Sequence, residues 1–244
     1  MGLTIDGKFV DVDHSHNQLL NTGRKGNPVV QIAGEGVDEI YVYSTFQRQM
    51  TPRSLSRAPD IIRGDNCHLL YALKGKNGLH TSFGAIRRLM LYFDVIVEDM
   101  IDQSGDFDAI VPMPSGHSIC SLYAKRLAAR YGRSLVNGLF NKISKQDART
   151  QLAAAALSWA DRKMLRNRIG KDNGDFTVKD IPTDYRYIFQ AVKLQSQNIP
   201  MGCSSFLLVD DLLASGSTLI EARRQLLVAV PGAYINAACL FSAI

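Results

Sequence analysis

Short apolar runs alternate with segments of helical periodicity from about residue 65 to the end of the chain. This alternation is the strongest constraint on the fold, because strands joined through helices form a parallel sheet with right-handed crossovers. The sequence therefore predicts the α/β class, with a parallel sheet flanked by helices. The expected strands are residues 107–112, 135–143, 206–209 and 233–241, and the expected helices are 81–103, 118–131, 151–168 and 217–228.

The first 60 residues have a different pattern, in which strand signals follow one another without helical periodicity. Residues 3–12 alternate apolar and polar side chains around Asp6-Gly7, which is the signal of a β-hairpin. Two further apolar runs, residues 29–32 and 39–44, are also typical of strands. We therefore expect a β-rich appendage over residues 1–60 and an α/β domain over residues 61–244.

Charge and apolar content limit the classes of partner. The formal net charge is +5 and the isoelectric point is about 9.0, an excess that favours anionic ligands without requiring nucleic acid. The four cysteines form no C-x-x-C pair that would indicate a zinc or redox site. No stretch approaches the roughly 18 apolar residues of a membrane span, and the first ten residues lack the apolar run of a signal peptide. We expect a cytoplasmic protein with no membrane partner.

Residues 206–218, FLLVDDLLASGST, predict a buried strand, two adjacent carboxylates and the start of a helix. The free backbone N–H groups at a helix start favour a phosphate, and Gly216 allows the backbone to approach it closely. Asp210 and Asp211 would repel a phosphate, but carboxylates accept strong hydrogen bonds from sugar hydroxyls. The pattern predicts a sugar-phosphate site. The alternative is a core strand followed by a helix that Ser215 or Ser217 caps, with solvated acids.

This 13-residue segment resembles the signature with which type I phosphoribosyltransferases bind phosphoribosyl pyrophosphate (PRPP). The match consists of apolar residues, Asp-Asp, and then small-Ser-Gly-x-Thr. The resemblance implies that Asp210 and Asp211 are catalytic residues that hold the ribose and are candidate ligands of Mg²⁺. It also implies that the 5-phosphate lies against Leu213, Ala214, Ser215, Gly216, Ser217 and Thr218. Hypoxanthine-guanine enzymes have an Asp at the position of Ala214, which argues against their substrate.

In chain order, residues 206–218 form the second junction of this kind, and residues 110–118, IVPMPSGHS, form the first junction. Its prolines end the strand, and the small residues after them leave backbone donors that suit an anion. The segment resembles the V-P-x-P pyrophosphate loop of amidophosphoribosyltransferases and ComF-type proteins. The resemblance implies that pyrophosphate lies against Pro114, Ser115, Gly116, His117 and Ser118. The alternative is an ordinary proline-bounded helix cap in which His117 has no special role.

Two basic segments accompany these junctions. Residues 71–76, YALKGK, resemble the A-L-K-Y-x-G segment of ComF-type proteins, which implies that Lys74 acts catalytically on the leaving group. Residues 141–171 contain eight lysines and arginines, and the resemblance implies that a basic loop here covers PRPP. The alternatives are a solvated basic turn and a solvated helix face.

Together these resemblances imply a Mg²⁺-dependent phosphoribosyltransferase that releases pyrophosphate. The acceptor is unidentified, with a nucleobase as one candidate, and residues 1–60 are expected to form a hood over it. This fold often forms homodimers. The alternatives are a non-catalytic PRPP-responsive regulator and a nucleic-acid accessory protein of ComF type. Nucleic acid is the less favoured partner, and salt-sensitive binding without nucleotide would identify it.

Overall fold

The computed structural model describes residues 2–16, 20–21, 29–34, 37–48 and 67–242. Its centre is a seven-stranded sheet whose main path runs β3-β5-β11-β10-β6-β7, with β4 paired to β5. The pairs from β5 to β7 along this path are parallel, whereas β3 and β4 are antiparallel to β5. The strands are β3 (Leu20–Asn21), β4 (Val29–Gly34), β5 (Val37–Arg48), β6 (Ala109–Pro112), β7 (Ser134–Leu135), β10 (Ser205–Leu213) and β11 (Tyr234–Ser242).

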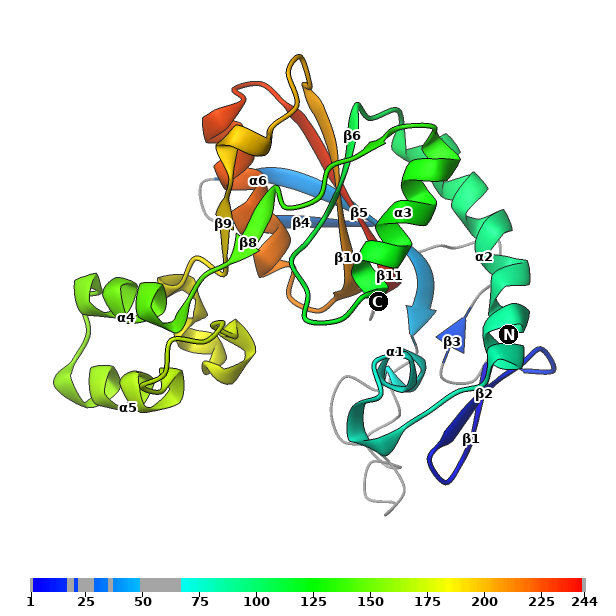
Figure 1. Cartoon of the computed structure of the whole chain (residues 1–244), viewed down its shortest axis with the longest axis horizontal. Coiled ribbons are helices and arrows are strands. Elements are labelled where there is room, and N and C mark those ends of the chain that lie inside the picture. Colours follow the sequence, from blue (N-terminus) through cyan, green and yellow to red (C-terminus); the bar gives the residue numbers. More distant parts are fainter. Residues whose placement is uncertain (1, 17–19, 22–28, 35–36, 49–66, 243–244) are drawn as a thin grey trace.

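Helices cover both faces of this sheet, so the predicted α/β class is confirmed (Figure 1). Side chains alternate across a strand, and Leu207 and Val209 of β10 therefore pack against one helical layer while Phe206 and Leu208 pack against the other. The first layer contains α1 (His68–Leu73), α2 (Phe83–Ser104) and α3 (Ile119–Tyr131), and α6 (Ser217–Ala229) covers the second face. Short 3-10 helices, η1 (Lys76–Gly78) and η4 (Ser196–Asn198), occur in the connections.

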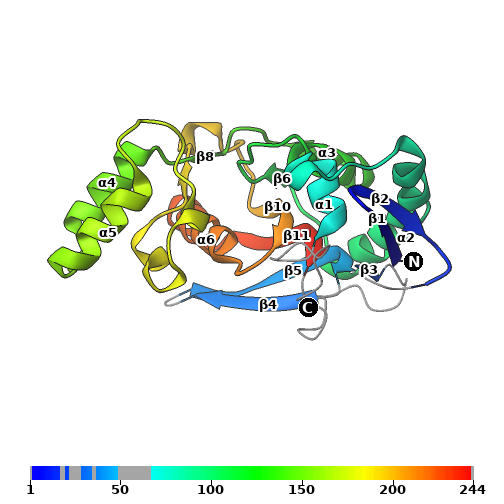
Figure 2. The ribbon, with the colours of Figure 1, turned by 90° about the horizontal axis from the view of Figure 1, so that it is seen from below.

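A helical subdomain, residues 143–190, extends from one end of the sheet (Figures 1 and 2). It connects to the rest through an antiparallel pair of short strands, β8 (Phe140–Lys142) and β9 (Val192–Leu194). It has its own apolar core, which includes Leu152, Leu165, Phe176 and Phe189. Its elements are α4 (Lys145–Ala154), α5 (Trp159–Ile169), η2 (Val178–Asp180) and η3 (Thr183–Ile188).

Two predictions in this region are wrong in detail. The single helix expected over 151–168 is two helices, because Ser144 caps α4, Ser158 caps α5, and the Arg162 guanidinium binds carbonyls at the end of α4. The strand expected over 135–143 is also divided between β7 and β8. Gly138, at φ +69°, lies between the two pieces, in a backbone conformation that glycine adopts without strain.

The N-terminal residues contain the predicted hairpin, in which β1 (Gly2–Asp6) pairs with β2 (Phe9–Asp13). The strands predicted at 29–32 and 39–44 are also present, as β4 and β5. However, β5 pairs in parallel with β11 and buries Val42 and Phe46 completely. Residues 37–48 are therefore part of the main sheet, whereas the sequence placed them in an appendage that ends at residue 60. That boundary itself falls outside the described residues.

Candidate functional site

The structure brings both predicted junctions together. Strands β6 and β10 are parallel neighbours with Pro112 beside Val209, and the Met113 amide donates to the Val209 carbonyl at 2.8 Å. The loops that follow both strands therefore leave the same edge of the sheet, where ligands of open α/β sheets bind. One difference from prediction is that β10 continues to Leu213. Asp210 and Asp211 thus lie within the strand and not beyond its end.

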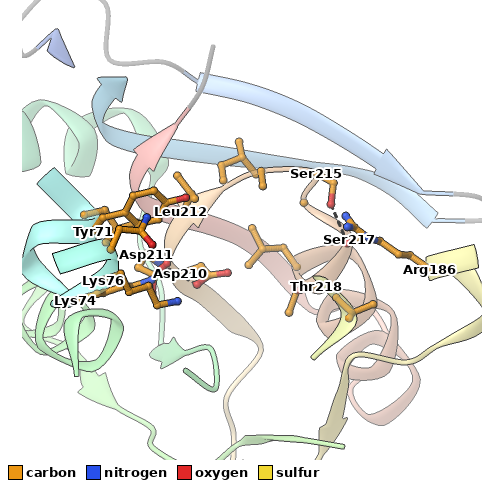
Figure 3. Close-up of a pocket in the computed structure, with 17 residues that line it drawn as sticks. Tyr71, Lys74, Lys76, Arg186, Asp210, Asp211, Leu212, Ser215, Ser217 and Thr218 are labelled. Carbon is orange, nitrogen blue, oxygen red and sulfur yellow. Dashed lines mark hydrogen bonds and ion pairs between the residues drawn. The ribbon is translucent and has the colours of Figure 1, made fainter. Parts of the chain in front are cut away.

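A pocket of about 450 Å³ lies against the second junction (Figure 3). Its walls come from β10, the start of α6, the end of α1 and the helical subdomain. Among the predicted site residues, it is lined by Lys74, Asp210, Asp211, Leu213, Ala214, Ser215, Gly216, Ser217 and Thr218.

A second pocket of about 250 Å³ lies against the first junction, where it is lined by Pro114, Ser115, Gly116 and His117. Both pockets share Lys74, Lys76, Asp210, Asp211 and Thr218, so they meet at the two acids. Ser118 lines neither of these two pockets. It is an exposed residue at the start of α3 and makes no side-chain cap there.

Gly216 fixes the shape of the second junction. It has φ +71°, and a Cβ at this position would collide with Cδ1 of Ile32 in β4. The left-handed backbone favours glycine here, and a Cβ would also force the end of the Ile32 side chain to move. Gly216 directly precedes α6 and has no side chain that could cap the helix. The Ser215 and Ser217 hydroxyls form a hydrogen bond with each other at 3.0 Å. The serine-capped helix considered from the sequence is therefore not formed.

The two acids have different environments. The Lys74 ammonium lies 2.6 Å from Asp211, and their side chains are only 9% and 7% exposed. The Ser115 hydroxyl also donates to Asp211, at 3.5 Å. Asp210 is partly exposed, and its carboxylate accepts the Asp211 amide at 2.8 Å. The structure thus separates a buried, ion-paired acid from a partly exposed one, whereas the sequence treated the two acids alike.

The charges around the pockets shift two pKa values. Burial lowers the pKa of His117, and Lys76 and Lys74 lower it further, so this imidazole is neutral at pH 7. Burial raises the pKa of the Cys120 thiol, as do Asp210 and Asp211. The Cys120 Sγ donates to the Val209 carbonyl at 3.1 Å. Cys120 is therefore a packing residue behind the junction and not a thiolate nucleophile.

Three of the eight basic residues predicted as a covering loop, Lys145, Arg149 and Arg162, make bonds within the helical subdomain. Lys145 pairs with Asp172, and the Arg149 guanidinium binds the Gly170 and Asp172 carbonyls. Lys142 differs from these, because it lines the second pocket. The subdomain also contributes Arg186, which lines the first pocket and which sequence reasoning missed. No spacing signal marks Arg186, because it lies 19 residues before the start of β10 in a segment without periodicity.

The carboxylates at the two pockets suit Mg²⁺ only as an ion that binds together with an anionic ligand. The described residues contain no group of three or more His, Cys, Asp or Glu side chains that could hold a metal ion. Mg²⁺ often takes one or two carboxylates together with substrate phosphates and water. Asp210 is partly exposed and lines both pockets, whereas the Asp211 carboxylate contacts Lys74. The site therefore fits an ion that arrives with an anionic ligand.

Comparisons of the chain with protein-family models, with curated proteins and with solved structures found no match. What the structure defines is an α/β protein with two polar pockets at the carboxyl edge of its sheet. No helix in the described parts of the chain has the length and apolar content needed to cross a membrane.

Proposed function

We propose that this protein is a type I phosphoribosyltransferase that binds PRPP across the two pockets. One observation carries the proposal: two anion-type junctions follow adjacent parallel strands, and their pockets meet at Asp210 and Asp211. PRPP has the matching order of groups, with a phosphate at one end, a ribose in the middle and a pyrophosphate at the other end. The sequence motifs assign the same order to the same residues.

In this arrangement, the loop from Leu213 to Thr218 binds the 5-phosphate through backbone N–H groups and hydroxyls. Asp210 accepts hydrogen bonds from the ribose hydroxyls. Pyrophosphate occupies the second pocket, between the loop from Pro114 to His117 and the side chains of Lys76 and Lys142. Lys74 lies at the boundary of the two pockets, where it holds Asp211 and faces the leaving group.

In the proposed reaction, the bond between the anomeric carbon and the pyrophosphate oxygen breaks, and pyrophosphate takes the electron pair. A lone pair of the acceptor forms the new bond to that carbon, and any proton on the attacking atom passes to water. The protein contributes positioning and electrostatic stabilisation of the charge that moves to pyrophosphate. Mg²⁺, when bound, neutralises further charge on the pyrophosphate.

The buried Lys74–Asp211 pair favours a second candidate, a protein that binds PRPP without transferring it. Since this pair engages one of the two acids, a single partly exposed carboxylate faces the ribose position. The two candidates predict the same binding of PRPP. They differ in whether pyrophosphate appears when nucleobases or other acceptors are added.

Calorimetric titration of PRPP, with and without Mg²⁺, tests the proposal. We expect saturable, Mg²⁺-dependent binding that Asp210→Asn weakens and that Ser217→Asp abolishes by placing a like charge in the phosphate loop. Asn167→Asp adds the same charge on exposed α5, outside the residues that line the pockets, and serves as the control. If the wild-type protein does not bind millimolar PRPP, the proposal is wrong.

A further inference from the structure

Arg186 reaches the first pocket from the helical subdomain. It lies in η3, and its side chain lines the pocket together with Ser215 and Ser217 of the second junction. Figure 3 shows the guanidinium directed toward Ser217 across the pocket from Lys74 and Asp211. A residue from a separate substructure is thus placed at the end of the pocket that the 5-phosphate would occupy.

The position of Arg186 is fixed by its own subdomain. Its Nε donates to the Ile181 carbonyl at 2.9 Å, which orients the plane of the guanidinium. The preceding residue, Tyr185, donates its hydroxyl to Asp161 of α5 at 2.8 Å. Phe189, just after η3, packs against Phe176 with ring centroids 5.0 Å apart. These contacts hold η3 to the subdomain core and reduce the entropy lost when the guanidinium binds a ligand.

The cations of the first pocket lie at opposite ends. Among the described residues that line it, Lys74, Lys76 and Arg186 carry positive charge. The two lysines lie at the end where both pockets meet, and Lys74 contacts Asp211 there. Arg186 lies at the other end, beside the hydroxyls of Ser215 and Ser217 (Figure 3). This distribution is complementary to a ligand with an anion at each end and a neutral sugar between them.

We infer that Arg186 binds the 5-phosphate group of the ligand, opposite the backbone of residues 214–218. A guanidinium binds two phosphate oxygens at once, and such charge-assisted pairs are stronger than neutral hydrogen bonds. The inference rests on the proposed function. It adds a residue outside the recognised motif and makes the helical subdomain part of the binding site. The chemical group that Arg186 would select is a terminal phosphate monoester on the sugar.

The test compares three charge-removing variants with two simple probes, ribose 5-phosphate and inorganic pyrophosphate. Arg186→Gln is expected to weaken ribose 5-phosphate binding by about 10- to 100-fold and to leave pyrophosphate binding unchanged. Lys142→Gln, which alters only the second pocket, should show the reverse preference. Arg168→Gln removes a charge from exposed α5 and should change neither. Arg186→Lys should restore only part of the affinity, because an ammonium cannot bind two oxygens in one plane.

Thermal unfolding of Arg186→Gln separates binding from structure, since loss of the bond to Ile181 alone would lower stability without selectivity for one probe. Equal ribose 5-phosphate affinity in wild type and Arg186→Gln, or an equal loss for both probes, overturns the inference. Titration of PRPP into the same proteins distinguishes the two proposals. If wild type binds PRPP and Arg186→Gln binds it equally well, only the role of Arg186 is wrong. If wild type binds none of PRPP, ribose 5-phosphate and pyrophosphate, both proposals are wrong.

Discussion

The two strand-to-helix junctions lie side by side but are confined in different ways. At the second junction, Gly216 has a left-handed backbone and lies directly against Ile32 of β4. At the first, Ser115 and Gly116 are exposed, and a Cβ on Gly116 would meet only the Lys142 ammonium, at 3.8 Å. One junction is therefore shaped by packed neighbours, and the other is bordered by the end of a flexible side chain.

This difference suits two different tasks. A backbone loop held in one conformation, as at the second junction, selects a ligand group by shape and retains it, which suits a 5-phosphate. An open loop beside lysines attracts an anion by charge and imposes less geometry, which suits a group that must depart. We therefore expect substitutions at the second junction to have larger effects than matching ones at the first.

The largest expected effect on PRPP binding is that of Gly216→Ala. The methyl group adds left-handed strain and a collision with Ile32, so we expect a loss of about 1–3 kcal/mol in the free energy of unfolding. We also expect PRPP binding to fall below detection in calorimetry. Gly132→Ala is the matched control, because Gly132 has φ +63° with open space around it. That control should be destabilised but should bind normally.

The matched substitution Gly116→Ala should change neither the free energy of unfolding nor the PRPP affinity appreciably. Its Cβ has room, and no left-handed conformation is imposed on it. If Gly116→Ala reduces PRPP affinity as much as Gly216→Ala does, the contrast between a rigid and an open junction is wrong.

Asp211→Asn should have a smaller effect on PRPP binding but a larger effect on stability, and it acts on both junctions. The Asp211 carboxylate accepts a hydrogen bond from Ser115 of the first junction and forms an ion pair with Lys74, although Asp211 lies in the strand of the second junction. The variant leaves the buried ammonium without its partner, at a cost of about 3–5 kcal/mol in unfolding free energy. Urea unfolding of Asp211→Asn, Lys74→Met and the double variant measures this cost. A double variant no more stable than Asp211→Asn alone would contradict the pairing.

The smallest expected effect is that of pH at His117. Its lowered pKa keeps the imidazole neutral at pH 7, and a bound anion favours the protonated form. Pyrophosphate affinity of wild type relative to His117→Gln should therefore rise as pH falls from 8 to 6, by about fivefold at most. Because the titration of pyrophosphate affects both proteins equally at a given pH, its contribution cancels in this ratio of affinities. A ratio that does not change with pH would place His117 away from the anion.

The sequence predicted those parts of the molecule that local patterns encode. The apolar run before Asp210 and the small residues after it identify a strand-to-helix junction, and Asp6-Gly7 identifies a hairpin. The helical composition of 151–168 was also recognised. Its division into α4 and α5 was missed because a serine cap and an arginine bound to carbonyls outweigh a favourable composition.

The missed parts depend on contacts between distant segments. Lys74 and Asp211 are far apart in the chain, and nothing near either residue shows that they pair. Ile32 and Arg186 are similar cases, since each reaches the second junction from a separate region. The expectation that residues 37–48 belong to an appendage was wrong for the same reason. The strand pattern of β5 is as compatible with an appendage as with the interior of a sheet, and only its pairing with β11 decides.

The pairing of β5 with β11 also constrains how the chain is made. The Tyr41 amide bonds to the Asn236 side chain, a partner 195 residues further along the chain. At ordinary rates of translation, β5 is synthesised about 10–40 s before its partner strand. During that interval the edge of β5 that pairs with β11 is exposed to other nascent chains, and such long-range pairing forms slowly. The sheet that carries the candidate site is therefore completed only after β11 has been synthesised, and a chaperone that shields residues 37–48 should raise the yield of folded protein.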